Sequence, residues 1–162
     1  MKRILPLLCT AALLTGCGAA DTPGDARKTA AVISGDDKIA AADNPQCQLF
    51  TPAEIAAFAG EPVKPGANGA GGLSCNWKAA DGVGIVIVTV SPAEYHVETS
   101  GAPGYRALPG VGKNGFVAGT GTSFTAATLD GDKAIFTNID TSGATEAKAI
   151  ALLQQIMART KA

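Results

Sequence analysis

Hydrophobic and polar residues alternate along segment 73–78, and this alternation predicts a half-buried β-strand. Leu73, Cys75 and Trp77 would point to one side of that strand, because successive side chains of an extended chain face opposite ways. Apolar residues occupy both faces of the next segment, 83–90. That pattern predicts a strand covered on both sides and placed centrally in a sheet. Glycines between the two segments mark the turn that joins them.

A helix-start signal occurs twice. Thr51-Pro52-Ala53-Glu54 combines a capping box with proline at the first helical position, and it predicts a helix that stops at Gly60. Ser91-Pro92-Ala93-Glu94 repeats the signal and predicts a short helix from Pro92 to about Thr99. Segment 64–72 is rich in glycine and is predicted to be a mobile loop.

The C-terminal half of the domain contains three further strand patterns and then a helical one. The strands are expected at Phe116 to Ala118, Ser123 to Leu129 and Ala134 to Ile139. From about Ala144 the apolar positions recur with a helical period and predict one buried face. The fold class is therefore α+β: a mainly antiparallel β-sheet packed by an N-terminal helix, a short middle helix and a C-terminal amphipathic helix.

The N-terminus has the order of a secretory signal, with Lys2 and Arg3 before the apolar run Ile4 to Leu14. The run ends in Leu14-Thr15-Gly16-Cys17, which resembles the lipobox of bacterial lipoproteins. The resemblance implies cleavage before Cys17 and acylation of its thiol. Ordinary cleavage after Ala20 is the alternative, since small residues also precede that bond.

Three regions follow from these patterns. Residues 1–16 are expected to be a lipoprotein signal peptide, residues 17–45 the lipidated cysteine and a flexible tether, and residues 46–162 a single globular domain. The alternative for part of the tether is a first strand at Thr29 to Ile33 that packs on the domain.

Charge and cysteine content limit the kinds of partner and cofactor that we expect this protein to bind. The formal net charge is −1, from 13 Lys+Arg against 14 Asp+Glu, and no basic stripe indicates a nucleic-acid partner. Once Cys9 leaves with the signal and Cys17 is acylated, Cys47 and Cys75 remain as a predicted disulfide, with two buried free thiols as the alternative. Two thiols and the single histidine do not fill a closed zinc shell, so neither a metal nor another cofactor is expected.

The candidate catalytic and binding residues lie around one predicted loop. His96 is the single histidine, and it would have to serve any catalytic triad, yet no serine motif accompanies it. The simpler interpretation of His96 is a surface or half-buried helix residue. Tyr95, Tyr105 and Arg106 flank the same loop and, with His96, form a possible binding groove. Alternatively, these side chains only cover the edge of the sheet. No catalytic residue is assigned.

The arrangement resembles a loose group of small bacterial lipoproteins of unassigned function. The resemblance rests on the lipobox, Cys47 to Ile55, Cys75-Asn76-Trp77, Gly110-Val111-Gly112 and the helix Ala144 to Thr160. It implies a domain of the PsbP/Mog1 class of α/β sandwich. Domains of this class are used for binding, so a binding role follows by analogy of fold.

The expected function is an envelope-anchored, non-enzymatic binding or accessory module. Its partners would be the lipid bilayer, reached through the acyl anchor, and an envelope protein or small ligand. In the lipoproteins that this chain resembles, an inner-membrane retention signal usually places Asp after the cysteine; this chain has Gly18 there, so the resemblance implies the outer membrane in a bacterium with two membranes. The alternative is a small hydrolase-like enzyme that uses His96.

Overall fold

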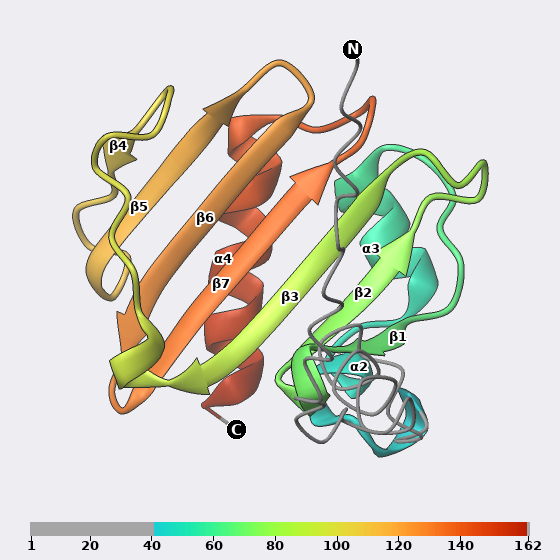
Figure 1. Ribbon diagram of the computed structural model, residues 1–162, viewed down its shortest axis with the longest axis horizontal. Coiled ribbons are helices and arrows are strands. Elements are labelled where there is room, and N and C mark those ends of the chain that lie inside the picture. The colour runs from blue at the N-terminus through green and yellow to red at the C-terminus, as the bar shows by residue number, and fades with distance from the viewer. Residues whose placement is uncertain (1–40, 162) are drawn as a thin grey trace, which may run out of the picture.

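The computed structural model describes residues 41–161 and shows one seven-stranded sheet (Figure 1). All strand pairs are antiparallel, and the strand order is β1-β2-β3-β7-β6-β5-β4. The strands are β1 Ala67–Gly69, β2 Ser74–Lys78, β3 Ile85–Pro92, β4 Arg106–Ala107, β5 Lys113–Thr120, β6 Ser123–Asp130 and β7 Lys133–Asp140. A C-terminal helix, α4 Glu146–Thr160, completes an α+β fold of the predicted class.

Hairpins form at the predicted glycine turns between β2 and β3, between β5 and β6, and between β6 and β7. In the β2–β3 hairpin Trp77 lies opposite Val86, and Cys75 lies opposite Val88. The pairing of β3 with β7 closes the longest connection, because 40 residues separate Pro92 from Lys133 and these two lie opposite each other. That pairing places β7 at the middle of the sheet.

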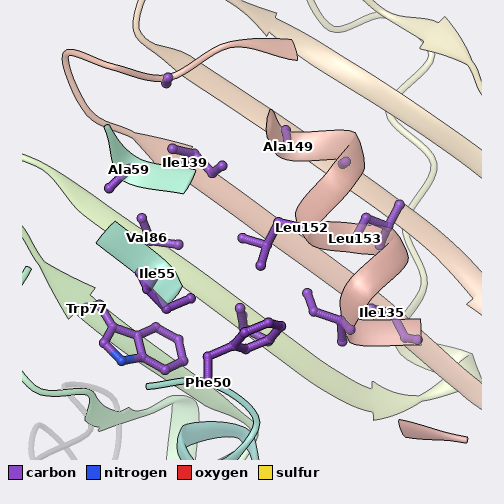
Figure 2. Packing of buried hydrophobic residues seen from close by; sticks show 14 of the residues in the cluster. Phe50, Ile55, Ala59, Trp77, Val86, Ile135, Ile139, Ala149, Leu152 and Leu153 are labelled. Carbon is purple, nitrogen blue, oxygen red and sulfur yellow. The ribbon is translucent and has the colours of Figure 1, made fainter. Parts of the chain in front are cut away.

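Both longer helices lie on the same face of the sheet, behind it in Figure 1. Thr145 caps α4, because its hydroxyl accepts from the Lys148 backbone N–H, and the helix packs on β5, β6 and β7. α3 spans Pro52–Ala59 and carries the capping box between Thr51 and Glu54. Figure 2 shows side chains of both helices meeting those of the sheet. The largest fully buried members of this core include Trp77, Ile55, Ile135, Ile139, Leu152, Leu153 and Ile156.

The other face of the sheet is open, so the prediction that β3 is covered on both sides is wrong. Val86 and Val88 are fully buried in the core, but Ile85 and Ile87 on the opposite face are only half-buried. Val83, in the preceding turn, is 89% exposed. Among the described residues no α-helix covers this face, and β3 is apolar on a side that faces outward.

The predicted middle helix is also wrong. Ser91 and Pro92 belong to β3 and pair with Ala134 and Lys133, so Ser91 is taken up in the β-ladder and caps no helix. Only a single 3-10 turn follows, at Ala93–Tyr95. Continued pairing with β7 therefore overrides the local helix-start signal.

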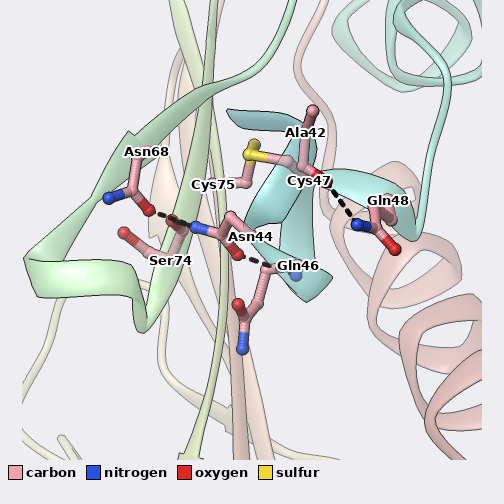
Figure 3. The surroundings of a disulfide bond; sticks show 8 residues. All are labelled: Ala42, Asn44, Gln46, Cys47, Gln48, Asn68, Ser74 and Cys75. Carbon is pink, nitrogen blue, oxygen red and sulfur yellow. Dashed lines mark hydrogen bonds between the residues drawn. A yellow bond between two sulfur atoms is a disulfide. The ribbon is translucent and has the colours of Figure 1, made fainter. Parts of the chain in front are cut away.

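A disulfide between Cys47 and Cys75 links the start of the described chain to the sheet, and the two Cα atoms are 5.0 Å apart. Cys47 lies in the short helix α2, Pro45–Gln48, which Figure 3 shows beside the start of β2. Asn44 caps α2 and also donates to the Ser74 carbonyl at 2.8 Å, so contacts with the sheet begin before Gln46. The predicted pairing of these cysteines agrees with the structure.

The glycine-rich segment 64–72 is more regular than predicted. It contains strand β1 and a 3-10 turn at Ala70–Gly72, and Asn68 lies opposite Cys75 in the β1–β2 ladder. This ladder pairs the segment with β2, which follows it directly in the chain.

Several predictions fall outside the described residues. These are the signal peptide 1–16, the lipidated Cys17, the tether as far as residue 40, and the alternative strand at Thr29 to Ile33. Within residues 41–161, none of the helices has both the length and the apolar character needed to cross a bilayer.

Candidate ligand-binding cavity

A cavity of about 670 Å³ lies on the open face of the sheet. Strands β3, β5, β6 and β7 supply its floor, and segment 95–103 forms one wall. Ala70 and Leu73, which precede β2, close another side. We call this space the sheet-face cavity.

The hollow results from one row of side chains across the sheet. Phe116 on β5 lies opposite Ala127 on β6, which in turn lies opposite Phe136 on β7. Thr89 on β3 continues the row beyond Phe136. The small side chain of Ala127 between two phenylalanines leaves space above the backbone, and Ala118 and Ala134 next to the row add to it.

Tyr105 supports the wall of the cavity from outside. Its ring stacks on Phe116 with the centroids 5.6 Å apart and the planes at 29°. Its hydroxyl donates to Glu98 Oε1 at 2.8 Å, and this hydrogen bond raises the pKa of Tyr105 because it favours the protonated phenol. Both interactions fix segment 95–105 over the open face of β5.

A close backbone contact ties the same segment to β5. The Gly119 N–H donates to the Pro103 carbonyl at 2.9 Å. Gly104 has φ +68°, and a Cβ there would lie 2.2 Å from the Gly119 carbonyl oxygen. Only glycine fits this position, so the path of the wall is set by the backbone as well as by the Tyr105 side chain.

His96 lines the cavity and is half-buried. It follows the 3-10 turn, where its backbone N–H donates to the Ala93 carbonyl, so its predicted position on a helix is wrong. Its ring lies 6.2 Å from Phe116, centroid to centroid. Nε2 is buried and has no hydrogen-bond partner among the described residues. A buried polar atom without a partner is uncommon and destabilising, and this nitrogen does not face the open space of the cavity.

The four predicted groove residues separate into three environments. Tyr95 and His96 line the cavity, and Tyr95 is largely exposed at its rim. Tyr105 packs behind Phe116 instead of facing the space. Arg106 is directed elsewhere, because its guanidinium forms an ion pair with Glu146 at the start of α4.

The floor residues were missed by the sequence analysis. Phe136 is 37% exposed in the middle of the sheet, and Phe116 and Ala127 share its face. The signal was present in β7, where Ala134, Phe136 and Asn138 alternate with the core residues Ile135, Thr137 and Ile139. A large aromatic residue on the non-core side of a strand indicates a second apolar surface.

The cavity is apolar and carries no formal charge. None of the described residues that line it is Asp, Glu, Lys or Arg. Its polar groups are hydroxyls and the imidazole, and one hydroxyl, that of Thr125, already accepts from Asn138 Nδ2 at 3.1 Å. The remaining hydroxyl residues of the lining are Thr89, Ser91, Tyr95, Thr99, Thr120 and Ser123.

Between Ala41 and Lys161 the structure contains no cluster of three or more His, Cys, Asp or Glu side chains suited to a metal ion.

No family model matches the chain, and no curated protein sequence matches it.

Proposed function

We propose that this protein is an envelope-anchored lipoprotein whose domain is a non-enzymatic binding module, and that the sheet-face cavity is its ligand site. One observation carries the proposal: a cavity of about 670 Å³ on the face of the sheet that no α-helix of residues 41–161 covers. Ligand pockets of proteins typically have volumes of about 300–1,000 Å³ and mostly apolar linings with a few polar groups. The sheet-face cavity has both properties.

The opposite face of the sheet, which packs on the helices, supports the assignment of the cavity as the ligand site. α3 and α4 pack on that face, and the Cys47–Cys75 disulfide fixes the start of the described chain beside β2. The large buried side chains lie between these helices and the sheet. In this proposal the helices and the disulfide hold the scaffold rigid, and the opposite face binds.

The anchored location rests on the sequence. Leu14-Thr15-Gly16-Cys17 matches a lipobox, and the predicted tether would separate Cys17 from the domain. The resemblance to small bacterial lipoproteins supports an address in the cell envelope, and Gly18 supports the outer membrane where there are two. The bilayer and a ligand or envelope protein are then the partners.

Replacing Cys17 with alanine tests the anchor. The substituted protein should leave the membrane fraction, because the thiol that would carry the acyl groups is gone. The wild-type protein should carry an acyl mass on Cys17 in intact-mass spectrometry. A Cys17→Ala protein that still sediments with membranes, beside a wild type without acyl mass, would contradict the lipoprotein assignment.

Binding is tested with diphenylhexatriene, an uncharged and wholly apolar fluorescent rod. Thr89 lies in the floor of the cavity, so Thr89→Trp should fill it and weaken diphenylhexatriene binding by roughly tenfold or more. Ile87→Trp is the matched control, because Ile87 lies on the same face of β3 but does not line the cavity. Diphenylhexatriene is excited directly, so that energy transfer from the added tryptophan does not contribute to the measured fluorescence. If the wild type does not bind the probe, or both variants bind as the wild type does, the cavity is not the site.

A further inference from the structure

We infer that residues 29–33 of this chain, Thr-Ala-Ala-Val-Ile, bind in the sheet-face cavity as an extended segment, and that an external ligand must displace them. These residues precede the part of the chain that the structure describes. The contact goes beyond the proposed binding role, because it makes access to the cavity depend on the protein's own N-terminal segment. Four features point to it: the apolar rim, the hydroxyls of the lining, the place where the described chain begins, and the charges beside the cavity.

The rim of the cavity exposes large apolar side chains. Five large hydrophobic residues are exposed within residues 41–161, and four of them line the cavity. These four are Leu73, Tyr95, Val97 and Phe136, with exposed fractions between 37% and 69%. A gathering of exposed apolar side chains marks a place where another apolar group binds. The longest apolar run between residues 18 and 40 is 30–33, so this segment supplies such a group.

The hydroxyl groups of the lining suit a peptide backbone. Each N–H and C=O of a buried extended segment needs a hydrogen-bond partner. Hydroxyls both donate and accept, and the lining carries them on three strands, with Thr89 on β3, Thr120 on β5 and Ser123 on β6. The side chains of Val32 and Ile33 can then meet the apolar rim while the backbone pairs with hydroxyls. The described lining carries no charged residue, which matches a segment of five uncharged residues.

The described chain begins beside the cavity. Asn44 donates to the Ser74 carbonyl at 2.8 Å, and the residue before Ser74, Leu73, lines the cavity. Ala41 is three residues before Asn44, so at most about 11 Å of chain separates them. The eight residues from Ile33 to Ala41 span up to about 28 Å when extended, which exceeds the distance of about 14 Å across four neighbouring strands. Residues 29–33 can therefore reach across the cavity.

Charges beside the cavity complement those that flank the segment. Arg27 and Lys28 come directly before residues 29–33. Glu98 in the wall and Glu94 in the 3-10 turn before it are both exposed, and neither forms an ion pair within residues 41–161. Exposed ion pairs add little affinity, but opposite charges favour one orientation of a bound segment. The acidic side of the cavity therefore favours a segment that is preceded by cations.

Covalent attachment makes this small contact effective. A segment joined to its site by a short linker experiences an effective concentration in the millimolar range. An external ligand then binds only to the fraction of molecules from which the segment has left, so its apparent dissociation constant is raised accordingly. The cavity is in this way closed to weak apolar ligands and open to those that bind tightly enough to displace residues 29–33.

Hydrogen exchange tests the contact without any ligand. The protein is residues 17–162 with Cys17→Ala, so that neither acyl chains nor detergent are present. Peptides that cover residues 29–33 should exchange at least roughly tenfold more slowly than those that cover residues 18–26. Thr89→Trp should fill the cavity and abolish this protection, whereas Ile87→Trp, on the same face of β3 but outside the cavity, should keep it.

Three results of this experiment would overturn the inference. The first is a wild type in which residues 29–33 are not protected. The second is protection that Thr89→Trp keeps or that Ile87→Trp also removes, because the segment would then lie elsewhere on the domain. The third is protection that disappears on dilution, which would assign the cavity to the same segment of a second copy of the chain.

Diphenylhexatriene binding tests the consequence for ligands. Val32→Asp combined with Ile33→Asp removes the apolar contacts of the segment, so this double variant should bind the probe roughly tenfold more tightly than the parent chain. Thr22→Asp combined with Ala26→Asp is the matched control, because it makes the same charge change outside residues 29–33 and should bind as the parent does. Equal affinities in all three chains, or equal gains in both double variants, would overturn the inference.

The two experiments separate this inference from the proposed function. If none of the chains binds the probe, the proposed ligand site fails, and the exchange data alone decide whether residues 29–33 occupy the cavity. If the parent chain binds the probe and shows no protection of residues 29–33, the cavity stays a ligand site and its occupation by this segment is rejected.

Discussion

Gly66 lies against the indole of Trp77, so closely that a Cβ on residue 66 would come 2.8 Å from Nε1. The same Cβ would lie 2.6 Å from the sulfur of Cys75. Both neighbours are fully buried and cannot move aside without disturbing the core. We therefore expect Gly66→Ala to lower the free energy of unfolding by about 1–3 kcal/mol, measured by urea denaturation.

Gly101→Ala is the control for this substitution. A Cβ at Gly101 would meet nothing within 4 Å, and Gly101 does not have a positive φ. Its replacement should leave the unfolding midpoint unchanged or raise it slightly, since alanine restricts the unfolded chain. Equal losses in the two variants would show that the contact with Trp77 and Cys75 is not the cause.

The disulfide between Cys47 and Cys75 should supply a large share of the stability. It joins residues 28 apart in the sequence, and the chain-entropy model gives about 3.5 kcal/mol for a loop of this size. Replacing both cysteines with alanine should therefore cost on the order of 2–5 kcal/mol in urea denaturation. Thiol labelling of the unfolded, unreduced domain should detect neither cysteine, and labelling after reduction should detect both. Two reactive thiols before reduction would contradict the pairing.

Glu54 links the start of α3 to the end of α4 and makes stability depend on acid. Its carboxylate accepts from Arg159 at 2.7 Å and from the Thr51 N–H at 2.7 Å. The bond to Arg159, followed by those to Thr51, lowers the pKa of Glu54 from 4.5 to about 2. The folded state therefore binds the proton less readily than the unfolded state does, and this contribution is lost as the pH falls from 4.5 towards 2.

The corresponding variant is Glu54→Gln. Its stability deficit relative to the wild type should be present near neutral pH and should shrink through that acid window, measured as the urea midpoint at each pH. Glu94→Gln, at an exposed glutamate of the 93–95 turn, serves as the control for the loss of one negative charge. A deficit of constant size down to the acid limit would contradict the lowered pKa.

Local signals and their limits explain which elements could be predicted. The Thr51 capping box and the helical period after Ala144 are local, and both helices form where these signals place them. The same local signal at Ser91 does not produce a helix, because Ser91 pairs with Ala134, 43 residues further along the chain. The four residues that make up a capping box carry no information about a strand partner so far along the chain.

The open face was missed for a related reason. The apolar alternation of β3 shows two hydrophobic sides but not whether a helix is available to cover the second. Ile87 could have met a helix had one formed at Pro92, and without that helix it stays half-buried. The cavity depends on Ala127 lying between Phe116 and Phe136, and this arrangement requires the register of three strands.

Tyr105 provides the last prediction, since its hydroxyl links the wall of the cavity to Glu98. The hydrogen bond to Glu98 raises the pKa of Tyr105 above its usual range, because a phenol that donates to a carboxylate resists losing its proton. Glu98→Gln should therefore lower this pKa, measured by ultraviolet titration in a Tyr95→Phe background in which Tyr105 is the single remaining tyrosine. Because the folded pKa is raised, the stabilisation is complete below the unfolded pKa and is lost as the pH rises through the folded value. Glu94→Gln should leave the titration unchanged. If Glu98→Gln leaves it unchanged too, the Tyr105 hydroxyl does not hold the wall, which then depends on the stacking on Phe116 and on the backbone contact between Pro103 and Gly119.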